Sequence, residues 1–197
     1  MNVFIFLAEA ASRRGFVISQ TLTDPKGYFQ LNKNPILECL ADQTNHDQNG
    51  NGSNMSGLSL RDEIIKALAE NTIEFPEQYL SIIGRDTWIN LMIQNPFFYR
   101  YQSKTPSEMK AHEEILMYLA SKFLTRRIAL IPFFEGDQED SFPCWNLSEN
   151  NIENLGTYYL LCCTNAFHYT FFMSIFPNWK QMFQKFISCL ELNLLQK

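Results

Sequence analysis

Residues 158–173, with the sequence YYLLCCTNAFHYTFFM, form the stretch that decides how this chain folds. Two apolar runs flank a short turn, a pattern typical of two buried strands that pair with each other. His168 and Tyr169 follow directly after the turn. A histidine held at the start of a strand, beside an aromatic residue, has the fixed ring that a general base needs. The alternative is a core histidine whose ring bonds a backbone carbonyl.

The bulk composition bounds the class of protein. A chain of 197 residues, with 46% hydrophobic and 19% charged residues, fits one globular domain. Its net charge of -5 argues against a nucleic-acid groove, which needs a basic face. No apolar run approaches the length of a membrane-spanning helix, and the N-terminal run VFIFL lacks the basic region of a signal peptide. We therefore expect neither a nucleic-acid nor a membrane partner.

The number and spacing of the cysteines indicate in which cellular compartment the protein is expected. The five cysteines are Cys39, Cys144, Cys162, Cys163 and Cys189. An odd number without a C-x-x-C pair is typical of reduced thiols, so we expect a cytoplasmic protein, with the nucleus as an alternative. No metal or cofactor is expected. The acidic run at 135–140 lacks EF-hand spacing, and His112-Glu113-Glu114 lacks the second histidine of a zinc-binding helix.

The N-terminal part of the chain predicts an extension followed by a well-capped helix. The extension covers residues 1–30 and includes a possible strand at 16–20. Asn34 is a favoured N-cap and Pro35 is the favoured first helical residue. Apolar residues then recur at helical spacing, so we predict a helix over residues 35–43.

The middle of the chain predicts a loop and two further helical segments, of which the second is short and begins over residues 75–80. Residues 45–57 are polar and of low complexity, which predicts a flexible loop. A second helix is predicted to begin at Ser59, with Asp62 as its capping-box partner. Residues 88–101 are aromatic and are expected to be irregular.

The C-terminal half predicts a long helix and then strands. Ser107 is expected to cap the helix and His112 to lie on its solvent side. A strand is predicted over residues 127–133, and the two strands around His168 follow. Residues 176–197 carry a continuous apolar stripe, which predicts an amphipathic helix. Helices first and strands gathered late predict an α+β fold with a small, mainly antiparallel sheet packed between helices.

Three segments together resemble one family. Residues 32–43 read NKNPILECLADQ and align without a gap on DGNCLFRALADQ, the common opening motif of ovarian-tumour (OTU) domain cysteine proteases, most of which are deubiquitinases. The run LRDEII at 60–65 is similar to a helix of that family. Residues 160–170, LLCCTNAFHYT, are similar to its closing strand, turn and His-Tyr pair. The resemblance covers residues 31–175 and implies an OTU-like, broadly papain-like single domain.

The departures from the family pattern fall on the catalytic positions. Pro35 stands at the nucleophile position, where proline supplies neither a thiol nor a backbone N–H. Asn32 replaces an aspartate of the motif. Thr170 stands where an acid or amide would orient the histidine ring. His168 alone matches the expected base.

Cys39 is an alternative nucleophile. It lies one helical turn after Pro35 on the same face, and a shift of the alignment would place it at the nucleophile position. A side chain in the second turn of a core helix is usually buried and unreactive, however. Cys162 and Cys163 alternate across a strand and are expected to serve packing.

The sequence therefore predicts a catalytically degraded OTU-like protein that acts as a protein-interaction or ubiquitin-binding module. Its expected partner is a protein, with ubiquitin as the candidate. The alternative function is an active cysteine deubiquitinase that hydrolyses ubiquitin isopeptide bonds, with His168 as base and Cys39 as nucleophile. A third possibility is an unrelated helical adaptor, in which no sheet brings His168 near Pro35.

Overall fold

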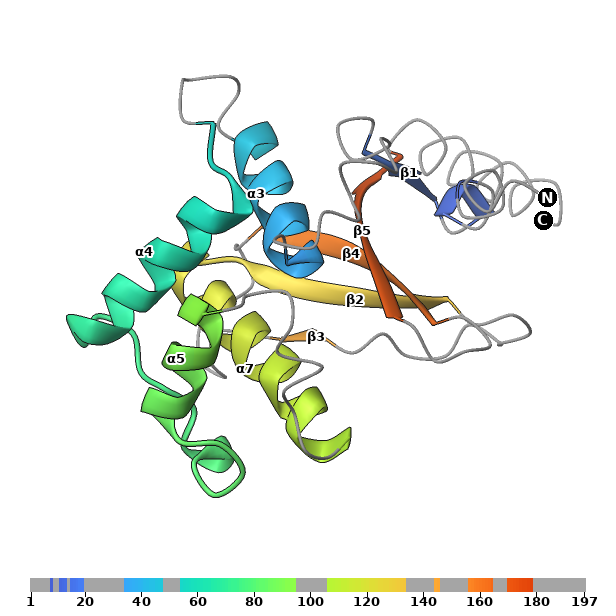
Figure 1. Cartoon of the computed structure of the whole chain (residues 1–197). Helices are drawn as coiled ribbons and strands as arrows, with labels where there is room; N and C mark the ends of the chain where they lie inside the picture. Colours follow the sequence, from blue (N-terminus) through green and yellow to red (C-terminus); the bar gives the residue numbers. More distant parts are fainter. Residues whose placement is uncertain are drawn as a thin grey trace, which may run out of the picture.

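The computed structural model describes residues 8, 11–13, 15–19, 34–47, 54–94, 106–133, 144–145, 156–164 and 170–178. Along the chain, its elements are β1 (Phe16–Ile18), α3 (Pro35–Asp47), α4 (Gly57–Ala69), the 3-10 helix η1 (Glu77–Tyr79), α5 (Arg85–Gln94), α7 (Pro106–Leu124), β2 (Arg127–Phe133), β3 (Cys144–Trp145), β4 (Thr157–Thr164) and β5 (Thr170–Pro177). The fold is therefore α+β, with most of the strand residues in the C-terminal half (Figure 1).

The strands form one mixed sheet in the order β1-β5-β4-β2-β3. Residues 158–173 contribute to its centre, where β4 and β5 pair antiparallel from Thr164↔Thr170 to Tyr159↔Ile175. The β1–β5 and β2–β3 pairs are also antiparallel. β2 and β4 are parallel, from Arg127↔Thr157 to Phe133↔Cys163. The expectation of a mainly antiparallel sheet is confirmed, with one parallel pair that the sequence did not reveal.

Helix α3 packs on the two central strands β4 and β5. The Gln43 carboxamide donates to the backbone oxygen of Tyr159 at 2.6 Å and accepts from the Tyr159 N–H at 2.9 Å. Further along the helix, the His46 ring meets the Phe176 ring edge-on at 4.7 Å between centroids. These contacts fix the second half of α3 against the start of β4 and the end of β5.

Helices α4 and α7 enclose the other side of the core. α4 contacts both α3 and α7, while α7 also contacts β2 and β3 (Figure 1). Gly57, the first residue of α4, is buried where a Cβ would meet the Glu38 carboxylate at 2.6 Å and the Glu38 backbone nitrogen at 3.0 Å. The start of α4 can approach α3 this closely because Gly57 has no side chain.

The core is formed by apolar side chains that project from all of these helices and from the sheet. Its largest fully buried members are Trp88, Ile36, Leu37, Leu40, Leu60, Ile64, Leu68, Met92, Ile115, Leu116 and Met117. The apolar face predicted for the 35–43 helix is therefore confirmed as core. Of the helices in the described ranges, none is both long enough and apolar enough to cross a bilayer.

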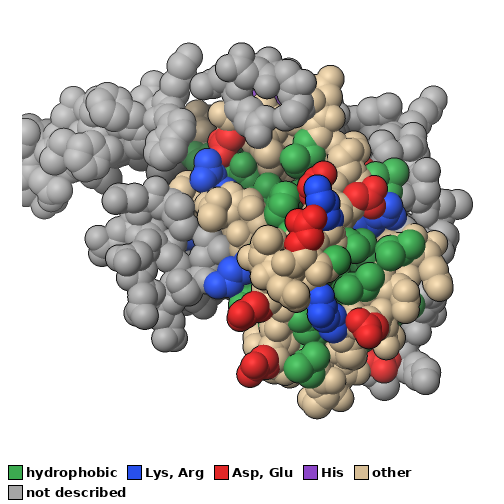
Figure 2. All heavy atoms as spheres, turned by 90° about the vertical axis from the view of Figure 1, so that its left-hand side faces the viewer, with side chains coloured by type: hydrophobic (Ala, Val, Ile, Leu, Met, Phe, Trp, Pro, Cys, Tyr) green, Lys and Arg blue, Asp and Glu red, His purple; other side chains and the backbone are tan. Residues whose placement is uncertain are grey.

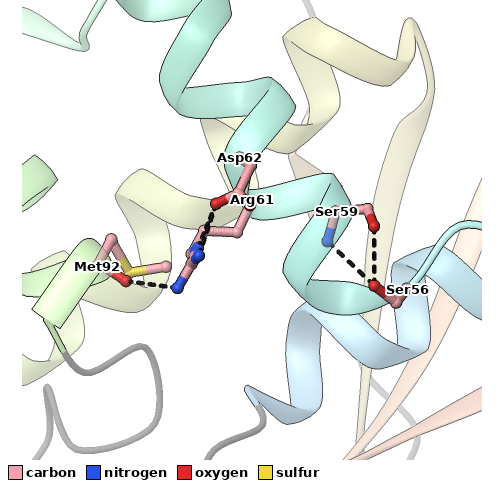
Figure 3. Close-up of polar contacts among 5 residues, drawn as sticks. All are labelled: Ser56, Ser59, Arg61, Asp62 and Met92. Atoms are coloured by element: carbon pink, nitrogen blue, oxygen red, sulfur yellow. Dashed lines mark hydrogen bonds and ion pairs between the residues drawn. The ribbon is translucent and has the colours of Figure 1, made fainter.

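Three predicted helix boundaries were wrong. α7 begins at Pro106, so Ser107 is its second residue and not its N-cap. α3 continues to Asp47, so residues 45–47 are helical and do not belong to a loop. α4 begins at Gly57, and its N-cap is Ser56, whose Oγ accepts from the Ser59 N–H at 3.1 Å (Figure 3). Asp62 does not complete a capping box. Its carboxylate instead accepts from Arg61 at 2.6 and 2.8 Å.

Three further expectations need correction. Residues 85–94 form helix α5, although the segment from residue 88 was expected to be irregular. His112 is buried, with 3% of its surface exposed, and does not lie on the solvent side of α7. β5 extends through Pro177, so residues 176 and 177 are strand. The remainder of the predicted C-terminal helix, residues 179–197, lies outside the described residues, as does most of the 1–30 extension.

Candidate functional site

The first turn of α3 contains the position at which the family pattern would place a nucleophile. Asn34 precedes the helix and is buried, with 2% exposed. Its Oδ1 accepts from the N–H of Ile36 at 3.0 Å and from that of Leu37 at 3.2 Å. The Glu38 N–H donates to the Asn34 backbone oxygen at 3.0 Å. The predicted N-cap is confirmed.

The Asn34 cap accepts hydrogen bonds from backbone N–H groups that the start of α3 would otherwise leave without partners. The first residues of a helix normally leave N–H groups without intrahelical partners, and these groups attract anions. In α3, Pro35 has no N–H, and Ile36 and Leu37 donate to the Asn34 side chain. An oxyanion that formed beside Pro35 would therefore have to compete with the Asn34 carboxamide for these amides. The turn therefore has the hydrogen bonds of a side-chain helix cap.

Cys39, the alternative nucleophile, lies in the second turn of α3. Its side chain is 0% exposed and belongs to the hydrophobic core cluster. A thiol in this position cannot meet a substrate unless the core opens, and buried structural cysteines are generally inert. The geometry therefore supports a packing role for Cys39.

The other predicted site residues are described only in part. Thr170 opens β5 and pairs with Thr164 across the β4–β5 ladder, which places its backbone at the end of β5 nearest the connection that carries His168. Asn32 and His168 lie outside the described residues. Of the five candidates, the structure thus brings together Pro35 and Cys39, which are one turn apart on α3.

The second half of α3 carries polar contacts that sequence reasoning missed. Asn45 repeats the arrangement of Gln43: its carboxamide donates to the Met55 oxygen and accepts from the Met55 N–H, both at 2.9 Å. The Gln43 side chain therefore links α3 to β4, and the Asn45 side chain links α3 to the segment that leads into α4. Gln43 falls within the family-like motif, but its neighbour Asn45 was hidden in a segment that resembled a polar loop.

A charged and aromatic cluster lies where α3 ends beside the start of β4. Arg126 Nε donates to the Asp47 carboxylate at 3.2 Å, and its guanidinium lies 5.9 Å from the centre of the Tyr158 ring. Burial raises the pKa of the Tyr158 hydroxyl above its ordinary value. Thr125, directly before Arg126, has a φ of 51°, an unusual value for a β-branched residue. The cluster brings together the end of α3, the turn from α7 into β2 and the start of β4.

Two histidines have contrasting surroundings. Burial lowers the pKa of His112 from 6.5 to about 4, while the nearby Glu108 carboxylate opposes the shift, so the imidazole is neutral at physiological pH. His46 is 57% exposed, and its Nε2 lies 4.0 Å from a carboxylate oxygen of Asp42, which is 6% exposed. Within the described parts of the chain, no three metal-ligating side chains gather into a cation site.

No protein-family model matches this chain, and no significant similarity to a curated protein or to a solved structure was found.

Proposed function

We propose that this chain is a non-catalytic OTU-like domain that binds a protein partner, with ubiquitin as the candidate, in the cytoplasm or nucleus. The observation that carries the proposal is the first turn of α3. The position of the family nucleophile is Pro35, and the adjacent amides of Ile36 and Leu37 are held by Asn34. A helix start that served a cysteine-dependent acyl-transfer reaction would need a thiol and vacant donors there.

The scaffold supports the OTU-like part of the proposal. The motif-like segment at residues 32–43 includes the capped helix start of α3, which packs on the antiparallel β4–β5 pair. The end of that pair nearest Thr164 and Thr170 leads into the segment with His168. An α+β core with its motif helix on the central strands is compatible with the resemblance.

The burial of Cys39 argues against the enzymatic alternative. A cysteine deubiquitinase must admit the C-terminal tail of ubiquitin to its thiolate. Cys39 is 0% exposed, and its neighbours Ile36 and Leu40 are 0% exposed as well. An interaction role needs no access to this thiol.

The proposal can be tested with a ubiquitin probe that carries a C-terminal electrophile. We expect no adduct with the unchanged chain, but an adduct with Pro35→Cys, because this change returns a thiol to the helix start. The matched control is Leu58→Cys, which places an exposed thiol in the first turn of α4. This control should react with a small alkylating reagent but not with the ubiquitin probe.

Two outcomes would contradict the proposal, and they differ in meaning. An adduct on the unchanged chain that disappears in Cys39→Ala would show an active enzyme. Equal labelling of Pro35→Cys and Leu58→Cys by the ubiquitin probe would show that ubiquitin is not recognised near α3. Mass spectrometry of the labelled peptide identifies the reacting cysteine in each case.

A further inference from the structure

Large apolar side chains are exposed mainly on one layer of the molecule. In the described part of the chain, four of the five belong to α4, α5 or the connection before α5: Leu58 at 37%, Leu80 at 50%, Ile82 at 42% and Ile93 at 53%. The fifth, Val17, lies on β1. Figure 2 views this side and shows hydrophobic side chains among charged ones. We name the outer surface of residues 57–94 the α4–α5 face. Exposed apolar residues that gather on one layer are candidate anchors for a binding partner.

Two arginines fix the geometry of this face. Arg61 on α4 donates to the carbonyl oxygen of Met92 near the end of α5 at 3.4 Å (Figure 3). Arg85, at the start of α5, donates to the carbonyl oxygen of Leu68 near the end of α4. The two helices therefore lie side by side and run in opposite directions.

The exposed apolar residues consequently occupy both ends of α5. Leu58 lies one turn before Arg61, and Ile93 directly follows Met92, so these two flank one end. Leu80 and Ile82 precede the other end. A ten-residue helix such as α5 spans about 15 Å. A partner helix laid along α5 would therefore offer its anchoring side chains about three turns apart.

The charge of this face restricts what can bind it. Residues 57–94 contain six acidic side chains, Asp62, Glu63, Glu70, Glu74, Glu77 and Asp86, and three basic ones, Arg61, Lys66 and Arg85. Both arginines are engaged with backbone carbonyls, and Arg61 is also paired with Asp62. Nucleic acid, an anionic membrane and a second copy of the face all carry like charge and would be repelled. A positively charged, partly apolar partner would be attracted.

We propose that the α4–α5 face binds a basic amphipathic helix of a partner protein. The apolar side of that helix would cover the residues at both ends of α5, and its lysines or arginines would face the acidic rim. This surface lies on α4, η1 and α5, and the inference does not depend on how the start of α3 functions.

The experiment uses the full chain and a fluorescent 18-residue helical peptide with leucine on one face and lysine on the other. Fluorescence anisotropy should show binding that weakens as the salt concentration rises. A peptide with glutamate in place of lysine should bind at least tenfold more weakly, a factor that corresponds to roughly 1.4 kcal/mol. The double variant Ile82→Ser/Ile93→Ser should weaken binding about fivefold, because it removes an anchor from each end of α5. Val17→Ser is the matched control, since it removes an equally exposed apolar residue from β1 and should leave binding unchanged.

A second variant tests the charge. Glu77→Gln/Asp86→Asn should weaken binding about threefold and flatten its salt dependence. Equal binding of the lysine and glutamate peptides would overturn the proposal, as would equal losses in Val17→Ser and the double variant. Self-association of the chain that disappears in Ile82→Ser/Ile93→Ser would instead assign the face to a second copy.

Discussion

At the scale of single residues, the local chemistry of Asn34 and Pro35 was readable from the sequence, whereas the environment of His112 was not. A cap depends on a few adjacent residues, so its signal is local. Burial of His112 depends on what covers α7. That helix is packed on by α4 and by the sheet, so its buried surface is wider than one apolar stripe and includes His112.

His112 predicts that stability depends on pH. Its pKa is about 4 in the folded chain and near 6.5 when unfolded, so the unfolded state binds the proton more readily between these values. The free energy of unfolding should therefore be highest above pH 6.5 and fall by about 2 to 3 kcal/mol as the pH drops toward 4. Urea unfolding at several pH values measures this slope.

The variant His112→Gln isolates this contribution, because glutamine is polar but does not titrate. The slope between pH 6.5 and 4 should be much shallower in this variant. His46→Gln is the control, since it removes another histidine and leaves His112 in place. If both variants keep the full slope, the buried imidazole is not its source.

At the scale of elements, the attachment of α3 depends on amide side chains. The Gln43 carboxamide bonds both the N–H and the C=O of Tyr159, as a peptide group of a neighbouring strand would. Gln43→Leu replaces the carboxamide by an apolar side chain and leaves the Tyr159 N–H and C=O without these partners. We expect a loss of about 2 to 4 kcal/mol in the free energy of unfolding, measured by urea denaturation.

Asn45→Leu is the matched comparison. It removes the equivalent pair of bonds to Met55, whose neighbours Asn54 and Ser56 are exposed. Water can replace the lost partners there, so the expected cost is below that of Gln43→Leu, at about 1 kcal/mol. A larger cost for Asn45→Leu would mean that the link to α4 outweighs the link to the sheet.

The elements differ in how well the sequence predicts them. Strands β2, β4 and β5 were predicted because each is a continuous apolar run, and α3 and α7 because apolar residues recur at helical spacing. The α5 helix was missed because Trp88 and the aromatic residues after Pro96 outweighed its weak periodicity. The cap at Ser56 was missed because Ser59, three residues later, also fits a capping pattern, and only the packing of Gly57 against Glu38 distinguishes the two.

At the scale of the whole molecule, strand order and the candidate site were the least predictable features. The parallel β2–β4 pair joins strands separated by the β3 segment, and no local signal encodes such long-range pairing. The same holds for the access to Cys39, which depends on residues from α3, α4 and α7 together. The residue types at Pro35 and Cys39 could be read from the sequence, but the burial of the Cys39 side chain could not.

The burial of Cys39 predicts its reactivity. Alkylation by iodoacetamide, followed by mass spectrometry of the Cys39 peptide, should be at least about a thousandfold slower in the folded chain than in urea. The rate should rise with denaturant as the global unfolding equilibrium does. Leu58→Cys supplies an exposed thiol whose labelling should be fast without denaturant. Rapid labelling of Cys39 under native conditions would reveal an opening of the core that the fold does not show.

The pairing of β1 with β5 has a consequence for how this protein is made. Phe16 pairs with Pro177, and the Asn178 N–H donates to the Gly15 oxygen, so the first and last described strands are neighbours. On the ribosome, β1 is synthesised roughly 160 residues before β5 is complete, a delay on the order of ten seconds or more at usual rates. During that interval β1 lacks its partner strand. The β1–β5 pair can form only after synthesis reaches Pro177, so the order of synthesis makes this pairing a late step in the folding of the nascent chain.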